Sequence, residues 1–97
     1  MQFKSSAQHP GRVLREEYLE PMGIAVGDLA RAIRVDESNV NDLVSTQRGC
    51  SGDMALRLAR ALNTKPQFWM GLQANYELYQ AKLLIGDEIE TNVEILG

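Results

Sequence analysis

The sequence predicts an all-α fold of five helices, and three observations support this prediction. Apolar residues recur at the helical spacing i, i+3, i+4, i+7 in several segments. Proline and glycine fall mainly near the expected ends of those segments. The composition, 44% hydrophobic and 24% charged over 97 residues, is that of an ordinary globular chain. This length is also that of one domain, so residues 1–97 are treated as a single unit.

Three central segments show the helical spacing most clearly, and helices are expected at about residues 25–33, 36–46 and 52–63. Asp36 and Ser51 precede the second and third of them, where a short polar side chain can accept hydrogen bonds from unpaired backbone amides. The apolar residues that define the three segments are Val26, Leu29, Ala30 and Ile33, then Val40, Leu43 and Val44, then Ala55, Leu58, Ala59 and Leu62.

Two further helices are expected on either side of this set, at about 11–22 and 66–85. Pro66 stands at the start of the second, a position that suits proline because it lacks an amide hydrogen. The apolar stripes are Leu14, Tyr18 and Met22 in the first helix, and Trp69, Leu72, Tyr76, Tyr79 and Leu83 in the second.

The tail, residues 86–97, follows a different pattern. Gly86 is expected to end the preceding helix. Beyond it, apolar and polar residues alternate from Ile89 to Leu96. The tail is therefore either a single strand that needs a partner edge or a frayed acidic end.

Charge is distributed unevenly along the chain. Ten Lys and Arg face thirteen Asp and Glu, a net charge of −3. Residues 1–66 carry nine basic and eight acidic side chains, whereas residues 67–97 carry one basic and five acidic side chains. Any surface that binds a polyanion must therefore be local and lie in the first two thirds of the chain.

Several classes of chemistry lack the residues they need. One histidine and one cysteine cannot supply an internal disulfide or the ligands of a usual zinc site, and no glycine-rich phosphate loop with its lysine is present. We therefore expect no cofactor, no metal and no enzymatic activity, and we expect Cys50 to pack as a small apolar residue. The sequence shows no membrane-spanning run and no signal peptide, so we expect a cytoplasmic protein without a membrane partner.

The two helices at 26–33 and 36–45 are separated by only two residues, Arg34 and Val35. Such a tight turn is typical of a helix-turn-helix, whose second helix enters the DNA major groove. Short polar side chains on the outer face of that helix can pair with base edges, and Arg48 beyond it can reach a phosphate or a guanine. The candidate DNA-binding residues are Ser38, Asn39, Asn41, Asp42, Ser45, Thr46, Gln47 and Arg48. The alternative is a solvated polar face on an ordinary three-helix packing.

Three blocks of residues form a combined motif. The first is His9-Pro10-Gly11 with the run from Val13 to Pro21. The second is Arg48-Gly49 with Ala55-Leu56-Arg57-Leu58-Ala59 and Leu62. The third is Pro66-Gln67-Phe68-Trp69 with Leu72-Gln73 and Tyr76-Glu77-Leu78. Together these blocks resemble the HigA/VapI-type antitoxins, and they cover residues 9–78, about seven tenths of the chain.

The resemblance implies a lambda-repressor-like helix-turn-helix domain that forms a homodimer. It also implies two partners: a palindromic operator in the promoter of the protein's own operon, and a small basic toxin of the HigB class, an mRNA-cleaving ribonuclease. Aromatic and apolar residues near the end of the chain are the candidates for the dimer or partner interface. They are Tyr76, Tyr79, Leu83, Ile89 and Val93, whereas Trp69 is expected to belong to the core.

The sequence departs from the family pattern where DNA is expected to lie. Ala25 and Val26 replace the usual Ser or Thr followed by Gln, Arg34 replaces a turn glycine, and Thr46-Gln47 replaces Gly-Lys. Asp42 places a carboxylate on the outward face, where it repels phosphates unless it accepts a hydrogen bond from a cytosine amine. These changes predict weaker DNA binding than in relatives. Two alternatives stay open: a toxin-binding module with little intrinsic DNA binding, and a toxin-free transcriptional regulator.

Overall fold

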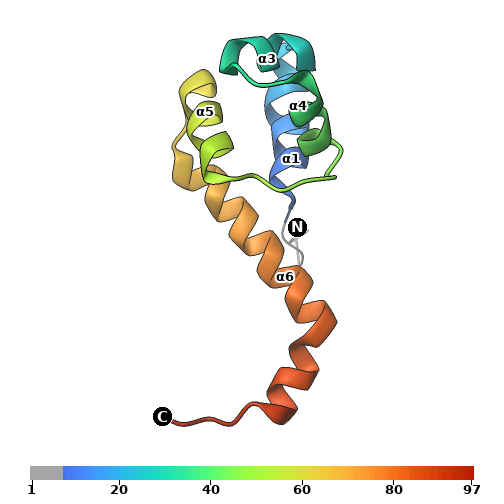
Figure 1. Cartoon of the computed structure of the whole chain (residues 1–97), viewed down its shortest axis with the longest axis vertical. Helices are drawn as coiled ribbons and strands as arrows, with labels where there is room; N and C mark the ends of the chain where they lie inside the picture. Colours follow the sequence, from blue (N-terminus) through green and yellow to red (C-terminus); the bar gives the residue numbers. More distant parts are fainter. Residues whose placement is uncertain (1–7) are drawn as a thin grey trace.

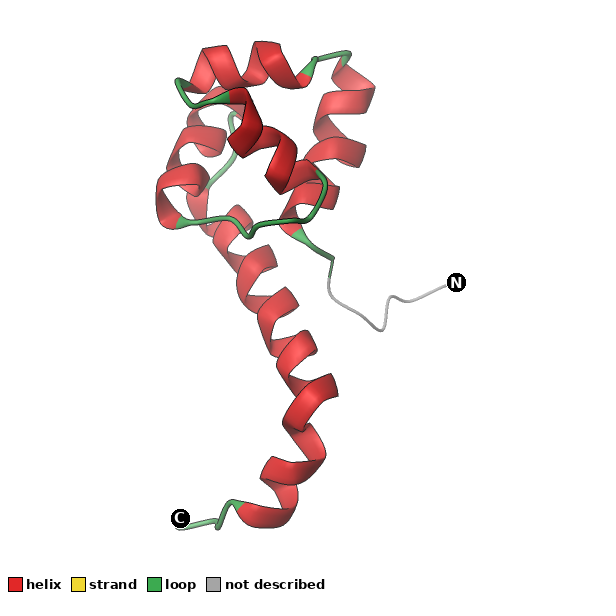
Figure 2. Ribbon diagram, turned by 45° about the vertical axis from the view of Figure 1, so that its right-hand side comes forward, coloured by secondary structure: helices red, strands yellow, loops and turns green. Residues whose placement is uncertain are grey.

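The computed structural model describes residues 8–97, and every regular element in that range is helical (Figures 1 and 2). Three elements follow one another without a break and form the first helical segment: α1 (Pro10–Val13), η1 (Leu14–Leu19) and α2 (Glu20–Met22). Four separate helices follow: α3 (Val26–Ile33), α4 (Glu37–Val44), α5 (Gly52–Leu62) and α6 (Pro66–Asn92). The all-α prediction is confirmed.

A single apolar core lies where the first segment, α3, α4, α5 and the start of α6 meet. Leu14, Val40, Leu43, Leu58 and Trp69 are completely buried there. The indole Nε1 of Trp69 donates a hydrogen bond of 2.8 Å to Thr64 Oγ1, so burial of this ring leaves no polar atom unpaired. The placement of Trp69 in the core is thereby confirmed.

The first helical segment widens into a π-helical turn at η1, which the apolar pattern did not reveal. Pro21 lacks an amide hydrogen and its ring crowds the carbonyl four residues earlier, so it disturbs the regular ladder of a helix. The amide of Glu20 donates instead to the carbonyl of Arg15, five residues back. Gly23 then ends the segment in the left-handed conformation, with φ of 65°.

His9 and Gly11 fix the start of α1 against α4. The His9 side chain caps the helix, because its Nδ1 accepts a hydrogen bond of 2.9 Å from the Gly11 amide. A β-carbon on Gly11 would lie 1.7 Å from the backbone oxygen of Leu43. Only glycine therefore allows α1 and α4 to approach this closely.

Helix α4 ends at Val44, two residues earlier than expected. Thr46 adopts the left-handed conformation, with φ of 62°, which stops the helix. The chain then folds back: the carbonyl of Asp42 accepts hydrogen bonds from the amides of Gln47 (2.7 Å) and Arg48 (3.2 Å). Thr46, Gln47 and Arg48 consequently belong to a turn rather than to the helix.

The expected end of the last helix at Gly86 is wrong, as is the tail expected over 86–97. Helix α6 continues through Gly86 to Asn92, and only residues 93–97 lie beyond it. A glycine inside a helix costs about 1 kcal/mol relative to alanine, which good helix formers on both sides offset. Ile85, Ile89 and Val93 are also four residues apart, so the pattern that suggested a strand fits a helix equally well.

Helix α6 leaves the helical body and projects away from it (Figure 1). Its 27 residues span about 40 Å, and the molecule measures 49 × 33 × 22 Å. The projecting half carries exposed apolar side chains on more than one face: Leu78, Leu83, Leu84, Ile85 and Ile89. Nothing in the described chain covers them, so this half of α6 exposes an apolar surface.

Candidate nucleic-acid interface

Helices α3 and α4 form the helix-turn-helix that the sequence predicted. α3 ends at Arg34, which adopts the left-handed conformation with φ of 62°. The amide of the next residue, Val35, donates a hydrogen bond of 3.1 Å back to the carbonyl of Ala30, which closes the turn. Arginine thus occupies a position that favours glycine, at a cost of about 1 kcal/mol.

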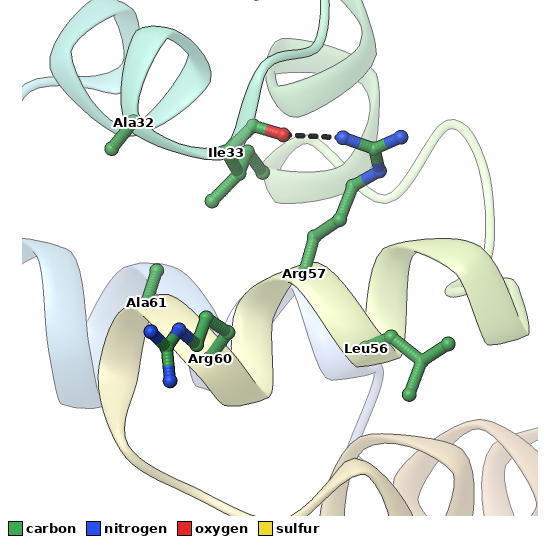
Figure 3. A pocket seen from close by; sticks show the side chains of 6 residues that line it. All are labelled: Ala32, Ile33, Leu56, Arg57, Arg60 and Ala61. Carbon is green, nitrogen blue, oxygen red and sulfur yellow. Dashed lines mark hydrogen bonds between the residues drawn. The ribbon is translucent and has the colours of Figure 1, made fainter.

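Arg57 of α5 holds this turn in place (Figure 3). Its Nη1 donates a hydrogen bond of 2.6 Å to the carbonyl of Ile33 and a longer one of 3.4 Å to that of Arg34. Asp53 pairs with Arg57 Nε at 2.6 Å and so orients the guanidinium. The last carbonyls of α3 are thereby satisfied from another helix, 24 residues away in the sequence, and no sequence pattern revealed this contact.

The outer face of α4 carries the predicted DNA-binding side chains. Val40 and Leu43 are buried beneath it and anchor the helix to the core. Asn39 and Asp42 are half-buried at its edges. The remaining predicted residues, in the helix and the turn after it, are exposed: Ser38, Asn41, Ser45, Thr46, Gln47 and Arg48.

Not every short polar residue near α4 acts as the sequence suggested. Asp36 stands at the N-cap position of α4, but its side chain makes no capping hydrogen bond. The Ser45 hydroxyl donates a hydrogen bond of 2.7 Å to the carbonyl of Asn41, so its hydrogen is not available to a base. Ala25, at the N-cap of α3, also provides no side-chain hydrogen bond, as expected from its methyl side chain. By contrast, the predicted cap of α5 is confirmed, since Ser51 Oγ accepts from the Met54 amide at 3.1 Å.

The carboxylate of Asp42 forms an ion pair of 3.7 Å with the guanidinium of Arg48. Both side chains are about half exposed, at 47% and 48%, so water screens the attraction and the pair contributes at most about 1 kcal/mol. A phosphate could therefore replace the carboxylate as the partner of Arg48. While the pair persists, Asp42 cancels the positive charge that this end of the interface offers to DNA.

Arg12 and Arg15 of the first helical segment lie beside the outer face of α4, and the sequence interpretation missed them. They line a hollow of about 520 Å³ together with Asn41, Ser45 and Thr46. Both guanidiniums are exposed and pair with Glu16, at 3.1 Å and 3.4 Å. The signal in the sequence was two arginines three residues apart on one predicted helix, which places them on the same face.

The turn after α4 runs into a buried junction with α6. The His9 ring donates a hydrogen bond to the backbone carbonyl of Arg48 and lies edge-on to the Tyr76 ring, 4.8 Å away. Burial of the imidazole lowers the pKa of His9 below its usual value, because desolvation disfavours the charged form. Burial likewise raises the pKa of the Cys50 thiol to about 11. Cys50 is thus a protonated core residue, as expected.

The predicted interface residues near the end of the chain fall into two groups. Tyr76 and Tyr79 are half-buried where α6 leaves the body, and Tyr76 packs on His9. Leu83, Ile89 and Val93 lie on the projecting half, with exposed fractions of 65%, 45% and 62%. Leu83, Ile89 and Val93 therefore offer more exposed surface to another chain than the two tyrosines do.

Within residues 8–97, no group of three or more His, Cys, Asp or Glu side chains is placed to hold a metal ion. None of the described helices is both long and apolar enough to cross a membrane.

Comparison with known proteins places the chain in one family. No protein-family model matches the sequence. Virulence-associated protein I of Dichelobacter nodosus is 46% identical over 76 residues, which are 78% of this chain and 70% of that protein. Antitoxin HigA-1 of Vibrio cholerae is 35% identical over 72 residues, 74% of this chain and 68% of that protein.

A solved structure agrees over nearly the whole length. The structure of the Pseudomonas aeruginosa antitoxin HigA with the higBA promoter superposes with a TM-score of 0.90 at 46% identity, and covers 94% of this chain and 99% of that one. The chain therefore belongs to the HigA family of antitoxins.

Proposed function

We propose that this protein is an antitoxin that represses its own operon by binding promoter DNA and neutralises a small basic toxin of the HigB class. The observation that carries the DNA-binding part is the exposed polar face of α4, held by α3, α5 and the core in helix-turn-helix geometry. The related HigA of Pseudomonas aeruginosa has been solved with the higBA promoter, which supports promoter binding by this chain.

Each group on this face has a role that follows from its chemistry. Ser38 and Asn41 touch base edges, since hydroxyl and amide groups match the donors and acceptors in the major groove. Ser45 donates its hydroxyl hydrogen to the Asn41 carbonyl and therefore meets a base edge only as an acceptor. Asn39, Thr46, Gln47 and Arg48 position the helix on the phosphates, and Asp42 limits that attraction. Arg12 and Arg15 add a second cationic edge, because their exposed ion pairs can exchange a carboxylate for a phosphate.

A palindromic operator calls for a two-fold dimer, in which the two copies of α4 are about 34–36 Å apart. The projecting half of α6 provides the contact, since its exposed apolar residues are otherwise left in water. Leu83, Ile89 and Val93 form the centre of that contact, and Tyr76 and Tyr79 lie at its edge near the body.

Neutralisation of the toxin is a binding function and needs no catalytic residue. The residues from 67 to 97 carry five acidic side chains and one basic one, so this end of the protein attracts a basic partner. Complementary charge speeds such an encounter more than it tightens the complex. Both the promoter and an mRNA-cleaving toxin lie in the cytoplasm, which is where the protein acts.

A promoter–reporter assay tests the DNA-binding part. The wild-type chain represses a reporter placed behind its own upstream DNA, and Asn41→Ala relieves the repression because a base contact is lost. Asp42→Asn strengthens repression, since it removes a like charge and releases Arg48. Asn75→Ala, at an exposed position of α6, is the matched control and represses as the wild type does. Repression that is indifferent to Asn41 contradicts the proposed face.

Co-expression tests the antitoxin part. The product of the small reading frame beside this gene arrests growth when expressed alone, and co-expression of this chain restores growth. Asn41→Ala still restores growth, because DNA binding and toxin binding are separate activities. Absence of a toxic neighbouring product contradicts the antitoxin role and favours a toxin-free regulator. Restored growth without any repression identifies a pure toxin-binding module.

A further inference from the structure

Gln73 of α6 is a buried polar residue that is hydrogen-bonded to the turn after α4. Its Oε1 accepts a hydrogen bond of 2.7 Å from the amide of Cys50, and its Nε2 donates one of 2.7 Å to Glu77 Oε2. Only 9% of the residue is exposed. A β-carbon on Gly49 would lie 2.7 Å from the amide group of Gln73, so the turn backbone packs directly on this side chain. Within residues 8–97, no other residue of α6 makes a side-chain hydrogen bond to the turn.

A second contact links α6 to the same turn, and it begins at Tyr76, about one helical turn after Gln73. Tyr76 lies three residues after Gln73, on the same side of α6. Its ring packs edge-on against His9, and His9 donates a hydrogen bond to the carbonyl of Arg48. The backbone from Arg48 to Cys50 is therefore held at both ends by contacts that start on α6.

The fixed turn determines where the Arg48 side chain can reach. The Arg48 amide is tied to the carbonyl of Asp42 at 3.2 Å, while the residue two places later is tied to Gln73. With its backbone held on both sides, the half-exposed guanidinium starts from a fixed point at the end of α4. A bond from a fixed donor to a phosphate loses less conformational freedom than one from a mobile turn.

We infer that Gln73 is a positioning residue for operator binding: it fixes the turn 48–50 so that Arg48 contacts a DNA phosphate. This inference rests on the proposed function, because it requires that the α4 face binds DNA. Gln73 itself does not touch DNA. Its effect passes through Arg48, so substitutions at the two positions are not additive.

The test measures fluorescence anisotropy of the full chain with its own upstream DNA at several salt concentrations. Each lost phosphate contact lowers the slope of log affinity against log salt by about 1. Gln73→Leu and Arg48→Gln each lower the slope by that amount, and the double variant lowers it no further. Gln67→Leu, an exposed glutamine on the same helix, is the matched control and keeps the wild-type slope.

An exchange of the two hydrogen-bonding groups provides a rescue. Gln73→Glu alone places two carboxylates together and lowers the slope. Combining it with Glu77→Gln restores both hydrogen bonds, since residue 73 then accepts from Cys50 and from residue 77, and the wild-type slope returns. Comparing Gln73→Glu with this double variant also tests the positioning role of Gln73 if Gln73→Leu does not fold.

Three results overturn the inference, and they are distinguishable. Wild-type binding with an unchanged slope in Gln73→Leu, or a double variant whose slope falls by the sum of the single effects, removes the positioning role alone. A wild-type chain that binds promoter and scrambled DNA equally weakly removes the proposed DNA-binding function, and the positioning role with it.

Discussion

Gly11 and His9 act where the first helical segment meets α4 and the turn after it. Gly11 admits the backbone of α4, and His9 caps α1 while it donates a hydrogen bond to Arg48. These two residues belong to the His-Pro-Gly motif, which in the sequence indicated only a family resemblance. Their roles in packing and capping explain why the motif stands at the start of the domain.

Gly11→Ala tests the close approach of α1 and α4. The new methyl group would overlap the carbonyl of Leu43, so we expect the free energy of unfolding to fall by at least about 2 kcal/mol. Gly71→Ala is the matched control, because Gly71 also lies within a helix and has nothing within 4 Å of the added carbon. It should raise the free energy of unfolding by about 0.5–1 kcal/mol. Urea unfolding measures both, and equal effects would contradict the packing described for Gly11.

His9 makes stability depend on pH. Its pKa is lowered in the folded protein, so the unfolded chain takes up the proton first as pH falls. The stabilisation is complete above the unfolded pKa of about 6.5 and is lost as pH falls below it. We expect the free energy of unfolding to decrease between pH 7 and pH 5. His9→Asn keeps a capping side chain that does not titrate and should lack this decrease; an identical decrease in both proteins would contradict it.

The helix-turn-helix shows how one element depends on another. Arg34 keeps a left-handed conformation because Arg57 of α5 binds the two carbonyls at the end of α3. α5 thus stabilises the turn as well as the core. In the same way, α6 holds the turn after α4 through Gln73.

Arg57→Leu tests the support from α5. Loss of a charged hydrogen bond to a partly buried carbonyl should lower the free energy of unfolding by about 1–3 kcal/mol. Arg60→Leu, on the same outer side of α5, is the matched control and should change it by less than about 0.5 kcal/mol. Thermal unfolding of both variants measures the difference. Equal destabilisation would show that Arg57 acts only as an exposed charge.

The elements differed in how well the sequence revealed them. The starts of α5 and α6 were predicted correctly, because Ser51 and Pro66 act locally at helix starts. The end of α6 was not, because Ile85, Ile89 and Val93 fit either period and Gly86 is tolerated within a long helix. For the candidate interface, too, local features could be predicted and long-range contacts could not. Side chains on α4 could be predicted from periodicity, whereas Arg12, Arg15, Arg57 and Gln73 act through contacts distant in sequence.

At the scale of the whole molecule, the helical body and the projecting half of α6 differ in structure and in proposed role. Figure 2 shows the second half of α6 standing clear of the helical body. The body holds the core and the proposed DNA-binding face, whereas the projecting half exposes apolar residues that a second copy can cover. Because the turn 48–50 is attached to α6 near the body, the proposed operator contact and the proposed dimer contact share one helix.

Ile89→Asp tests the dimer contact. A carboxylate among the exposed apolar side chains opposes burial against a second chain, so we expect the protein to become monomeric and to lose most of its operator affinity. Asn75→Asp, an exposed residue on the same helix, adds the same charge and should stay dimeric. Sedimentation velocity measures the state of each variant, and a dimeric Ile89→Asp protein would place the contact elsewhere.

The central claim, that α4 reads the promoter of the protein's own operon, is tested most directly by fluorescence anisotropy. The purified chain is titrated into its own upstream DNA and into scrambled DNA of equal length, at two salt concentrations. We expect tight binding to the upstream DNA, weaker binding to the scrambled DNA, and an affinity that falls with salt as phosphate contacts are screened. Weak binding that is equal for the two DNA sequences would contradict the claim and leave the protein as a partner-binding module.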